Sequence, residues 1–379
     1  MAFKIGVPKE LAEGETRVSV IPETVKRLVG KGLEVVVEKG AGAEAGYSDE
    51  AYEAAGAKIE SSHKKVLGES DMVLKVQQPL TKGEDEVSML KEGASLIAFL
   101  QPFSSAELLK KLAKQKVTAM GMEMVPRITR AQNMDALSSM ATVVGYKAVL
   151  LAANEFHRFF PMFMTAAGTI APARVLVLGA GVAGLQAIAT AKRLGAVVEA
   201  FDTRPVVKEQ VESLGGKFVG LDLAHEDAQD EGGYAKELSE DHHKKELELI
   251  ESRLPRTDIV ITTAQIPGKQ APMLITKEMA AKMKPGSIIV DLAADTGGNS
   301  ELSEAGKVVE KDGVTYIGLS NLPTLMPVHA SQMYSKNLGN LVFHLIGDDG
   351  LNLDFEDPIT AGVVVTHGGE IVHPALKDS

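Results

Sequence analysis

Short apolar runs alternate with amphipathic stretches along most of the chain, and this alternation predicts the fold. In the first third, the runs with strand character cover residues 3–7, 33–37, 72–76, 96–100 and 117–120. Helical patterns, such as those at 23–29 and 106–112, lie between them. A strand, a helix and a second strand in succession form a crossover unit whose strands run parallel. The first third therefore predicts an α/β domain with a parallel sheet.

The second third repeats this alternation, with predicted strands at 175–178, 197–201, 259–263, 287–292 and 315–319. Residues 135–157 contain one glycine, no proline and many Ala, Leu and Met residues, which predicts a long helix between domains. A second helical pattern at 331–343 carries the chain back. We expect two Rossmann-like α/β domains with parallel sheets, joined by long helices with a cleft between them. The predicted domains are 1–135 plus 344–379, and 136–343 including the linking helices.

Two adjacent uncharged runs, 159–173 and 175–191, together exceed the ~20 residues that span a bilayer. Arg174 divides them, Gly and Thr are frequent in both, and the second has a strand-turn-helix pattern. A buried α/β core is therefore predicted for both runs, without a membrane span. The N-terminus lacks the basic and apolar regions of a secretory signal, so a cytoplasmic location is expected.

Composition narrows the possible chemistry. The 379 residues are 45% hydrophobic and 24% charged, as in ordinary globular proteins, and the net charge of −11 argues against nucleic-acid binding. The absence of cysteine excludes disulfides, thiolate metal sites and thiol nucleophiles, and no metal site is expected.

Residues 222–251 hold eleven Asp or Glu residues against three Lys. Such a run predicts a solvated loop and a charged helix. Gly232, Gly233 and Tyr234 interrupt the run with two flexible positions beside an aromatic ring, so a lid that closes over a ligand remains the alternative.

The clearest motif is a glycine-rich turn between a predicted strand and helix, Gly179-Ala-Gly181-Val-Ala-Gly184. In dinucleotide-binding proteins the first glycine permits the tight turn, the second admits the pyrophosphate, and the third lets the helix pack on the strand. The N-terminus of the helix then offers free N–H groups to the phosphates. Because a second strand follows and ends in an acidic residue, Asp202, the sequence predicts a bound dinucleotide.

Asp202 also predicts which dinucleotide binds. A carboxylate at this position bonds the adenosine ribose hydroxyls and repels a 2′-phosphate, which favours NAD(H) over NADP(H). Arg204 weakens this preference, because an arginine can accommodate a 2′-phosphate, although it could also pair with Asp202. NAD(H) is therefore the predicted nucleotide of the second domain.

Residues 124–140 resemble the NAD(H)-binding component of proton-translocating transhydrogenases, which belong to a family that also contains alanine dehydrogenase. The resemblance extends over nearly the whole chain and includes the segments 6–10, 74–77, 165–169, 232–236, 262–268 and 371–375. It implies hydride transfer between NADH and NADP⁺ held on a partner subunit, together with a membrane-spanning subunit that couples transfer to proton translocation. It also implies a homodimer located at the inner face of the cell membrane through these partners.

The resemblance implies specific site residues as well. It assigns catalytic positioning of the nicotinamide to Arg127, Gln132, Asp135 and Ser138, with Gln132 nearest the second nucleotide. Without the resemblance, each of these residues is an ordinary cap or ion-pair candidate, and Asp135 in particular suits a helix N-cap. The residues expected to bind NAD(H) are Gly179, Gly181, Val182, Ala183, Gly184, Asp202, Thr203, Arg204, Tyr234, Ala264 and Gln265.

An NAD-dependent alanine or amino acid dehydrogenase is the main alternative. Such enzymes pair a catalytic lysine with a catalytic histidine for proton transfer, and Lys75 matches the lysine. The segment that matches the histidine region ends at Gln101, which does not titrate. Hydride exchange between two nicotinamides needs no proton transfer at carbon, so the sequence favours a transhydrogenase. A non-catalytic NAD(H) sensor is a second alternative, and Lys75 and Asp295 have no assigned role.

Overall fold

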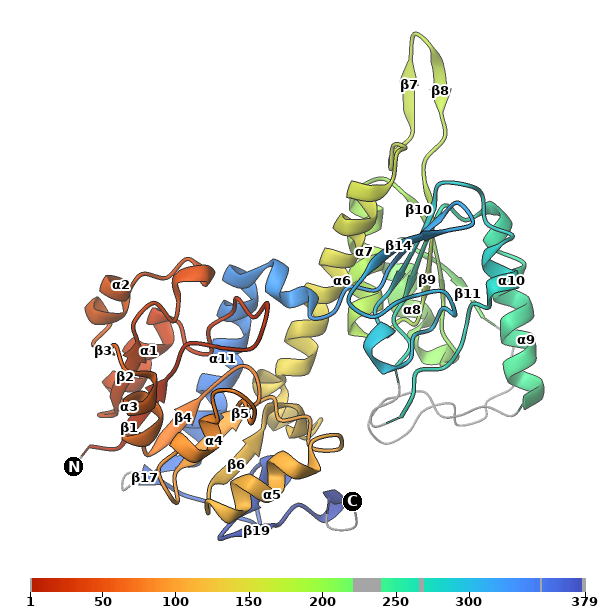
Figure 1. The fold of residues 1–379 in the computed structure, drawn as a ribbon. Helices are drawn as coiled ribbons and strands as arrows, with labels where there is room; N and C mark the ends of the chain where they lie inside the picture. The colour runs from red at the N-terminus through yellow and green to blue at the C-terminus, as the bar shows by residue number, and fades with distance from the viewer. Residues whose placement is uncertain (1, 221–239, 266–268, 348–349, 377–379) are drawn as a thin grey trace. The chain divides into compact units, whose positions relative to one another are not determined.

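The computed structural model describes residues 2–220, 240–265, 269–347 and 350–376, and the chain divides into two compact units (Figure 1). Unit 1 comprises Met1–Met140 and Pro323–Ser379, and unit 2 comprises Ala141–Leu322. Each unit is built on its own mixed sheet, in which most strands are parallel. Residues 222–239 of the acidic run, including Gly232, Gly233 and Tyr234, for which a lid was the alternative, lie outside the described residues.

Unit 1 contains an eight-stranded sheet in the order β19-β18-β6-β5-β4-β1-β2-β3. Strands β1 to β6 are parallel, and β18 and β19 extend the sheet as antiparallel strands. The strands are β1 Lys4–Val7, β2 Glu34–Glu38, β3 Lys58–Glu60, β4 Met72–Leu74, β5 Ser95–Ala98, β6 Thr118–Gly121, β18 Val364–His367 and β19 Glu370–Ile371. The helices are α1 Pro22–Gly30, α2 Asp49–Ala54, α3 His63–Gly68, α4 Glu86–Met89, α5 Ala106–Lys114, α11 Pro327–Leu345 and α12 Pro358–Val363.

Unit 2 contains a seven-stranded sheet in the order β11-β10-β9-β12-β13-β15-β14, in which only β14 is antiparallel. The strands are β9 Arg174–Leu178, β10 Val197–Phe201, β11 Lys217–Val219, β12 Ile259–Thr262, β13 Ser287–Asp291, β14 Val308–Lys311 and β15 Val314–Ile317. The helices are α7 Val182–Arg193, α8 Lys208–Ser213, α9 Glu240–Glu251 and α10 Lys277–Ala280.

Both sheets have the strand order of a Rossmann fold. Reading from β3 in unit 1 and from β11 in unit 2, the six parallel strands follow the order 3-2-1-4-5-6 within each unit. The order reverses between β1 and β4 in unit 1 and between β9 and β12 in unit 2. Ligands of such sheets bind outside the carboxyl ends of the strands at these reversal points. The prediction of two Rossmann-like α/β domains with parallel sheets is thus confirmed, and each unit has one place where a ligand is expected.

Strand β9 shows why the middle of the unit 2 sheet is continuously apolar. Val175 and Val177 face a core that includes Ala187 of α7, whereas Leu176 and Leu178 face the core on the other side of the sheet. Successive side chains of a strand point to opposite faces, so a strand covered on both faces needs an apolar residue at every position.

Helix α6, Ala136–Glu155, begins in unit 1 and continues through unit 2, close to the predicted helix at 135–157. It is long and apolar enough to span a bilayer, and 39% of its most apolar window is buried within the protein. Its residues Ala148, Val149 and Ala152 belong to the core of unit 2. Core packing therefore accounts for the apolar character of these residues.

The domain boundary differs from the prediction at helix α11. We expected 331–343 to belong with the second domain, but the helix lies in unit 1. The hydroxyls of Ser331 and Ser335 accept hydrogen bonds from the main-chain N–H groups of Val18 and Ile21, both at 3.0 Å. Tyr334 donates to the carbonyl of Lys75 at 2.8 Å. These polar contacts connect α11 to segments more than 250 residues away in sequence, which a local pattern does not reveal.

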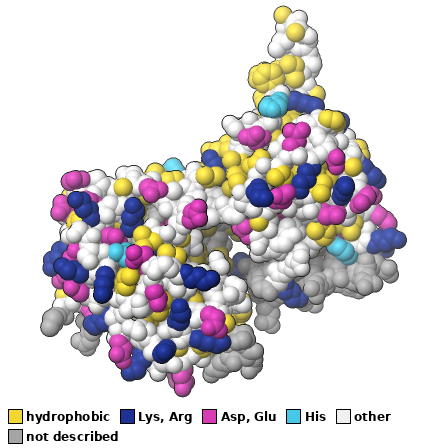
Figure 2. All heavy atoms as spheres, viewed as in Figure 1, with side chains coloured by type: hydrophobic (Ala, Val, Ile, Leu, Met, Phe, Trp, Pro, Cys, Tyr) yellow, Lys and Arg dark blue, Asp and Glu magenta, His cyan; other side chains and the backbone are white. Residues whose placement is uncertain are grey.

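The prediction of a buried core for 159–173 was wrong. This segment forms a hairpin of β7, Phe163–Thr165, and β8, Gly168–Ile170, that projects from the rest of unit 2 (Figure 1). Met164 is 78% exposed, Met162 58% and Phe159 53%. Figure 2 shows hydrophobic side chains along the projection. Apolar composition predicted burial, but the hairpin has no counterpart within the described part of unit 2 to cover it.

The reversal point of the unit 1 sheet is occupied by buried charges. Lys75, immediately after β4, is 1% exposed and lies between two carboxylates, Glu10 at 3.2 Å and Glu86 at 2.9 Å. His63 continues the cluster, because its Nδ1 lies 2.7 Å from Glu38 and its Nε2 lies 3.1 Å from Glu86. Burying so many charges is tolerated only when opposite charges compensate one another.

The same contacts set the protonation of this cluster. Burial alone would lower the pKa of Lys75, but the carboxylates of Glu10 and Glu86 raise it above its ordinary value. Burial also opposes protonation of His63, yet its bonds to Glu38 and Glu86 raise the pKa of the imidazole to about 9. Lys75 and His63 are therefore cations at neutral pH, and Lys75 is not available as a base.

We predict that His63→Gln destabilises the protein in a pH-dependent manner. A folded-state pKa above that of the unfolded chain gives stability that is fully present below about pH 6.5 and is lost as pH rises through about 9. The loss is expected to be about 2 kcal/mol at pH 6, after allowance for solvent screening. Urea unfolding at pH 6, 7.5 and 9.5 measures it. Lys64→Gln, a change at the exposed neighbouring position, is the control. A difference between His63→Gln and the unmodified chain that stays constant across this pH range would contradict the assigned charge state.

Candidate functional site

The glycine turn after β9 has the geometry expected of a phosphate-binding turn. Gly179 has φ of 97°, a left-handed conformation that favours glycine. A Cβ on Gly184 would lie 1.9 Å from the carbonyl oxygen of Gly179, so the first turn of α7 passes directly against the loop. A Cβ on Gly181 would meet no atom within 4 Å, so space remains beside the N-terminus of α7. A pyrophosphate fits these features, because α7 presents its first N–H groups there.

The carboxyl end of β12 lies beside this turn. Thr263 follows β12 and donates its hydroxyl to the carbonyl of Gly179 at 3.1 Å. Ala264 and Gln265 come next, which places these two predicted residues at the reversal point of the unit 2 sheet. The side-chain amide of Gln265 donates to the carbonyl of Leu292 at 3.0 Å.

Asp291 and Asn299 hold this edge together, although the sequence analysis did not select either residue. Asp291 is 1% exposed and accepts hydrogen bonds from Thr262 and from the main chain at residues 293, 299 and 300. Asn299 donates to the carbonyl of Ala264 at 2.9 Å and to that of Pro272 at 2.8 Å. The only sequence indication was an acidic residue at the end of an apolar strand. Asp295, which had no assigned role, accepts from Ser320 at 2.5 Å.

Asp202 lies where the motif predicts, at the carboxyl end of β10, but its carboxylate is already engaged. Oδ2 accepts from the N–H of Ala180 at 2.7 Å and from Nη2 of Arg204 at 2.8 Å. Oδ1 accepts from the main-chain N–H of Arg204 at 2.9 Å and from its Nε at 2.8 Å. A carboxylate has about four lone-pair sites, and these four bonds use them. The ribose hydroxyls of a nucleotide can therefore bond Asp202 only after the Arg204 side chain moves.

The pairing with Arg204 is the alternative that the sequence left open, and it neutralises the charge expected to repel a 2′-phosphate. Between these two residues, the hydroxyl of Thr203 is buried and has no hydrogen-bond partner in the described part of the chain. A nucleotide hydroxyl could supply such a partner.

The 127–138 segment lies in unit 1. Arg127 and Gln132 are exposed, so their side chains are accessible to a ligand. Asp135 and Ser138 bond one another: Asp135 Oδ1 accepts from the N–H of Ser138 at 2.8 Å, and Oδ2 accepts from its hydroxyl at 2.6 Å. This is the helix-capping arrangement, at the start of α6. The structure therefore brings Asp135 and Ser138 together and gives both of them a structural function.

Gln101 stands at the end of the segment where alanine dehydrogenases are expected to carry a histidine. It has φ of 50° and is exposed. The Glu123 carboxylate accepts the main-chain N–H groups of Leu100 and Gln101. Burial raises the pKa of Glu123 despite these bonds. No sequence pattern indicated this carboxyl group, whose hydrogen bonds support the main chain at residue 101.

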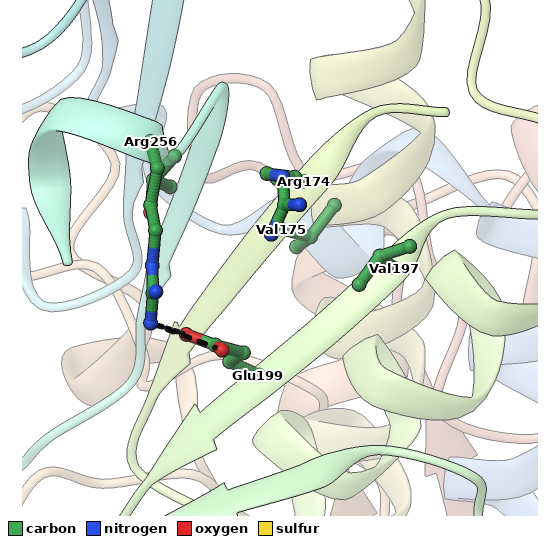
Figure 3. Close-up of a pocket in the computed structure, with 6 residues that line it drawn as sticks. Arg174, Val175, Val197, Glu199 and Arg256 are labelled. Carbon is green, nitrogen blue, oxygen red and sulfur yellow. Dashed lines mark hydrogen bonds and ion pairs between the residues drawn. The ribbon is translucent and has the colours of Figure 1, made fainter. Parts of the chain in front are cut away.

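A small hollow on unit 2 does not coincide with these residues. It is lined by Arg174, Val175, Val197, Glu199, Arg256 and Thr257. Figure 3 shows that it lies over the starts of β9 and β10, where Arg256 is paired with Glu199 at 3.3 Å. The glycine turn follows the opposite end of β9, so this hollow does not lie at the candidate phosphate-binding turn.

Comparison with known proteins agrees with the geometry. Residues 6–144 match the protein family described as "Alanine dehydrogenase/PNT, N-terminal domain". Residues 148–374 match the family described as "Alanine dehydrogenase/PNT, C-terminal domain". An NAD(P) transhydrogenase alpha subunit of Rhodospirillum rubrum is 53% identical over 379 residues, which cover 99% of each chain. Alanine dehydrogenase of Halomonas elongata is 30% identical over 387 aligned positions, which cover 100% of this chain and 96% of the relative.

A solved transhydrogenase structure is also similar to this chain over nearly its whole length. The transhydrogenase of Sinorhizobium meliloti superimposes with a TM-score of 0.85 at 42% identity, covering 98% of this chain and 99% of that one. Because the two domain families together match nearly the whole length, the chain belongs to the alanine dehydrogenase/PNT family.

Proposed function

We propose that the chain is the NAD(H)-binding component of a proton-translocating, Re/Si-specific transhydrogenase, and that it takes part in hydride transfer between NADH and NADP⁺ held on a partner subunit. The observation that carries this proposal is the difference in identity within one family. Over essentially the full length, identity is 53% to a transhydrogenase subunit and 30% to an alanine dehydrogenase. Gln101 supports the same choice, because it stands where alanine dehydrogenases are expected to carry a catalytic histidine.

The residues of unit 2 have the chemistry to hold NAD(H). The open space at Gly181 and the N-terminus of α7 accept the pyrophosphate, and Asp202 accepts the ribose hydroxyls once Arg204 has moved. Val182, Ala183, Thr203, Ala264 and Gln265 follow the carboxyl ends of β9, β10 and β12, and the proposed set also includes Tyr234, which lies outside the described residues. The nicotinamide of the bound nucleotide supplies the hydride.

The residues of the 127–138 segment act on the position of the nicotinamide. Arg127 and Gln132 bear side chains that donate hydrogen bonds, and we assign them to the nicotinamide ring and its carboxamide. Asp135 and Ser138 contribute by closing the segment at the start of α6. None of the four has to gain or lose a proton, because hydride transfer depends on orientation and distance.

The proposal includes partners. An NADP(H)-binding subunit holds the second nucleotide, and a membrane-spanning subunit couples transfer to proton translocation. This chain then lies in the cytoplasm, at the inner face of the cell membrane. We also propose a homodimer, supported by the apolar hairpin β7–β8, because an exposed apolar patch of this kind is typical of an interaction surface.

The alternative, an alanine dehydrogenase, is tested by offering both reactions to the same preparation. With an NADP(H)-binding transhydrogenase subunit present, the chain is expected to reduce NADP⁺ with NADH. With alanine and NAD⁺ over a range of pH, NADH formation is expected to stay below ~1 s⁻¹, a low rate for a working enzyme. Turnover of alanine above that rate would restore the dehydrogenase assignment. Nucleotide binding without either reaction would favour a sensor.

The assignment of Asp202 predicts nucleotide selectivity. The unmodified chain should bind NADH more tightly than NADPH, as measured by titration of nucleotide fluorescence. Arg204→Ala should increase this preference, because it leaves the Asp202 carboxylate uncompensated and removes a group able to pair with a 2′-phosphate. Asp202→Asn should decrease it. Equal affinity of the unmodified chain for the two nucleotides would show that Asp202 does not select NAD(H).

The assignment of Gln132 predicts a defect in transfer without a defect in binding. Gln132→Asn shortens the side chain by one methylene, and small misplacements slow a transfer step by ~10²-fold. NADH affinity should stay close to normal, whereas single-turnover transfer to NADP⁺ on the partner should fall steeply. Arg127→Ala should reduce transfer and also weaken nucleotide binding. An unchanged transfer rate in Gln132→Asn would remove the 127–138 segment from the site.

A further inference from the structure

The main chain on either side of Gln132 is fixed, although its side chain is exposed. Gln132 lies in a short 3₁₀ helix, η3, Thr129–Met134. Within this helix Ala131, which precedes Gln132, is 0% exposed, and Met134, two residues after Gln132, is 6% exposed, so both are buried in unit 1. Asp135, the next residue, forms the cap of α6. Gln132 therefore projects from a backbone that is held on both sides.

Two asparagines of α11 provide the most specific of these restraints. The side-chain amides of Asn337 and Asn340 both donate to the carbonyl oxygen of Asn133, at 2.9 Å and 3.0 Å. Residues three apart lie on the same side of a helix, which lets both amides reach one acceptor. A carbonyl oxygen has two lone pairs, and this pair of bonds uses both. The peptide unit that joins Asn133 to Met134, one residue beyond Gln132, is thus clamped by two donors.

A third restraint acts from another element. Arg130 of η3 is paired with Asp357 at 2.5 Å, and Asp357 also accepts from His344 at 2.8 Å and caps α12. Arg130 is 61% exposed, so solvent and salt screen this pair. The asparagine pair is better placed to hold the segment, because Asn337 is only 8% exposed.

The burial of Asn337 is not explained by stability alone. Its Oδ1 is buried and has no hydrogen-bond partner within the described residues. An unsatisfied buried oxygen destabilises the fold, so an apolar residue would serve packing better at this position. A group retained against such a penalty calls for another explanation, and the bond from the same amide to Asn133 offers one.

We propose that Asn337 and Asn340 are positioning residues for hydride transfer, which act by clamping the Asn133 carbonyl and so fixing the main chain that carries Gln132. The inference rests on the proposed function, in which Gln132 orients the nicotinamide. Transfer is sensitive to displacements of a fraction of an ångström to an ångström, whereas binding draws on contacts elsewhere in the nucleotide site. Loosening the clamp therefore slows transfer and leaves NADH affinity nearly intact.

The test compares Asn337→Ala, Asn340→Ala and the double variant by single-turnover transfer from NADH to NADP⁺, with an NADP(H)-binding transhydrogenase subunit present. Each single variant keeps one donor on the carbonyl and should lose little. The double variant should lose roughly 10-fold or more in rate, which exceeds the product of the single losses. Its dissociation constant for NADH should stay within about 2-fold of normal. Lys336→Ala, an exposed change on the same helix, is the matched control.

Hydrogen exchange supplies a readout that does not depend on activity. Exchange of amides in residues 128–138 should accelerate in the double variant and remain unchanged in the Lys336→Ala control. If the double variant does not fold, the combination of Asn337→Ser and Asn340→Ala is used in its place in both measurements. Serine keeps a small polar group at the buried position.

The possible outcomes test the clamp itself and its role in hydride transfer separately. Unchanged exchange in the double variant would overturn the clamp, and faster exchange with an unchanged transfer rate would overturn its role in positioning. A loss of NADH affinity in parallel with rate would also overturn it, because the clamp would then serve general folding of the site. Absence of transfer by the unmodified chain would instead refute the proposed function, and with it the role in transfer.

Discussion

Unit 2 depends on a close approach of main chains at the first turn of α7. A Cβ on Gly184 would lie 1.9 Å from the oxygen of Gly179, and a Cβ on Gly145 of α6 would lie 2.1 Å from the oxygen of Ala183. The start of α7 is therefore held between the glycine turn and a second helix. Any side chain at these positions would displace α7, and with it the N–H groups at its N-terminus, which we propose bind a phosphate. The glycines thus fix the position of the proposed phosphate site.

Each unit pairs a buried charged side chain with an opposite charge, but the consequences differ between the units. In unit 1, Lys75 is paired with Glu10 and Glu86, is almost fully buried, and keeps its proton. In unit 2, Asp202 is paired with Arg204, and the pair must open before a ribose can bond the carboxylate. One pair removes a residue from acid–base chemistry. Under the proposed function, the other makes nucleotide selectivity depend on the movement of Arg204.

Much of the fold could be predicted from the sequence, because it is encoded locally. The strand Arg174–Leu178, the turn that follows and the long helix α6 all occur within a residue or two of their predicted limits. The placement of α11 could not be predicted, since Ser331 and Ser335 bond residues more than 300 positions away. The hairpin of β7 and β8 was mistaken for core because apolar content does not report whether a partner surface exists.

The candidate site likewise has parts that the sequence could predict and parts that it could not. The glycine turn and Asp202 are a contiguous motif, so the sequence could place them, and the helix-cap alternative for Asp135 was also visible. The clamp of Asn337 and Asn340 on Asn133 was not visible, because it joins segments about 200 residues apart and uses residue types that are common on surfaces. Restraints of this kind arise from tertiary packing, and no local spacing encodes them.

The central claim is direct hydride transfer by a site that orients nucleotides without moving protons, and isotope transfer tests it most directly. NADH carrying deuterium at the transferred position of C4 is mixed with the chain, NADP⁺ and an NADP(H)-binding transhydrogenase subunit, and the NADPH formed is analysed by mass spectrometry. The account predicts that the deuterium is recovered in NADPH and that none enters from solvent when unlabelled NADH is used in D₂O. Loss of the label to water, or incorporation of solvent deuterium, would contradict it.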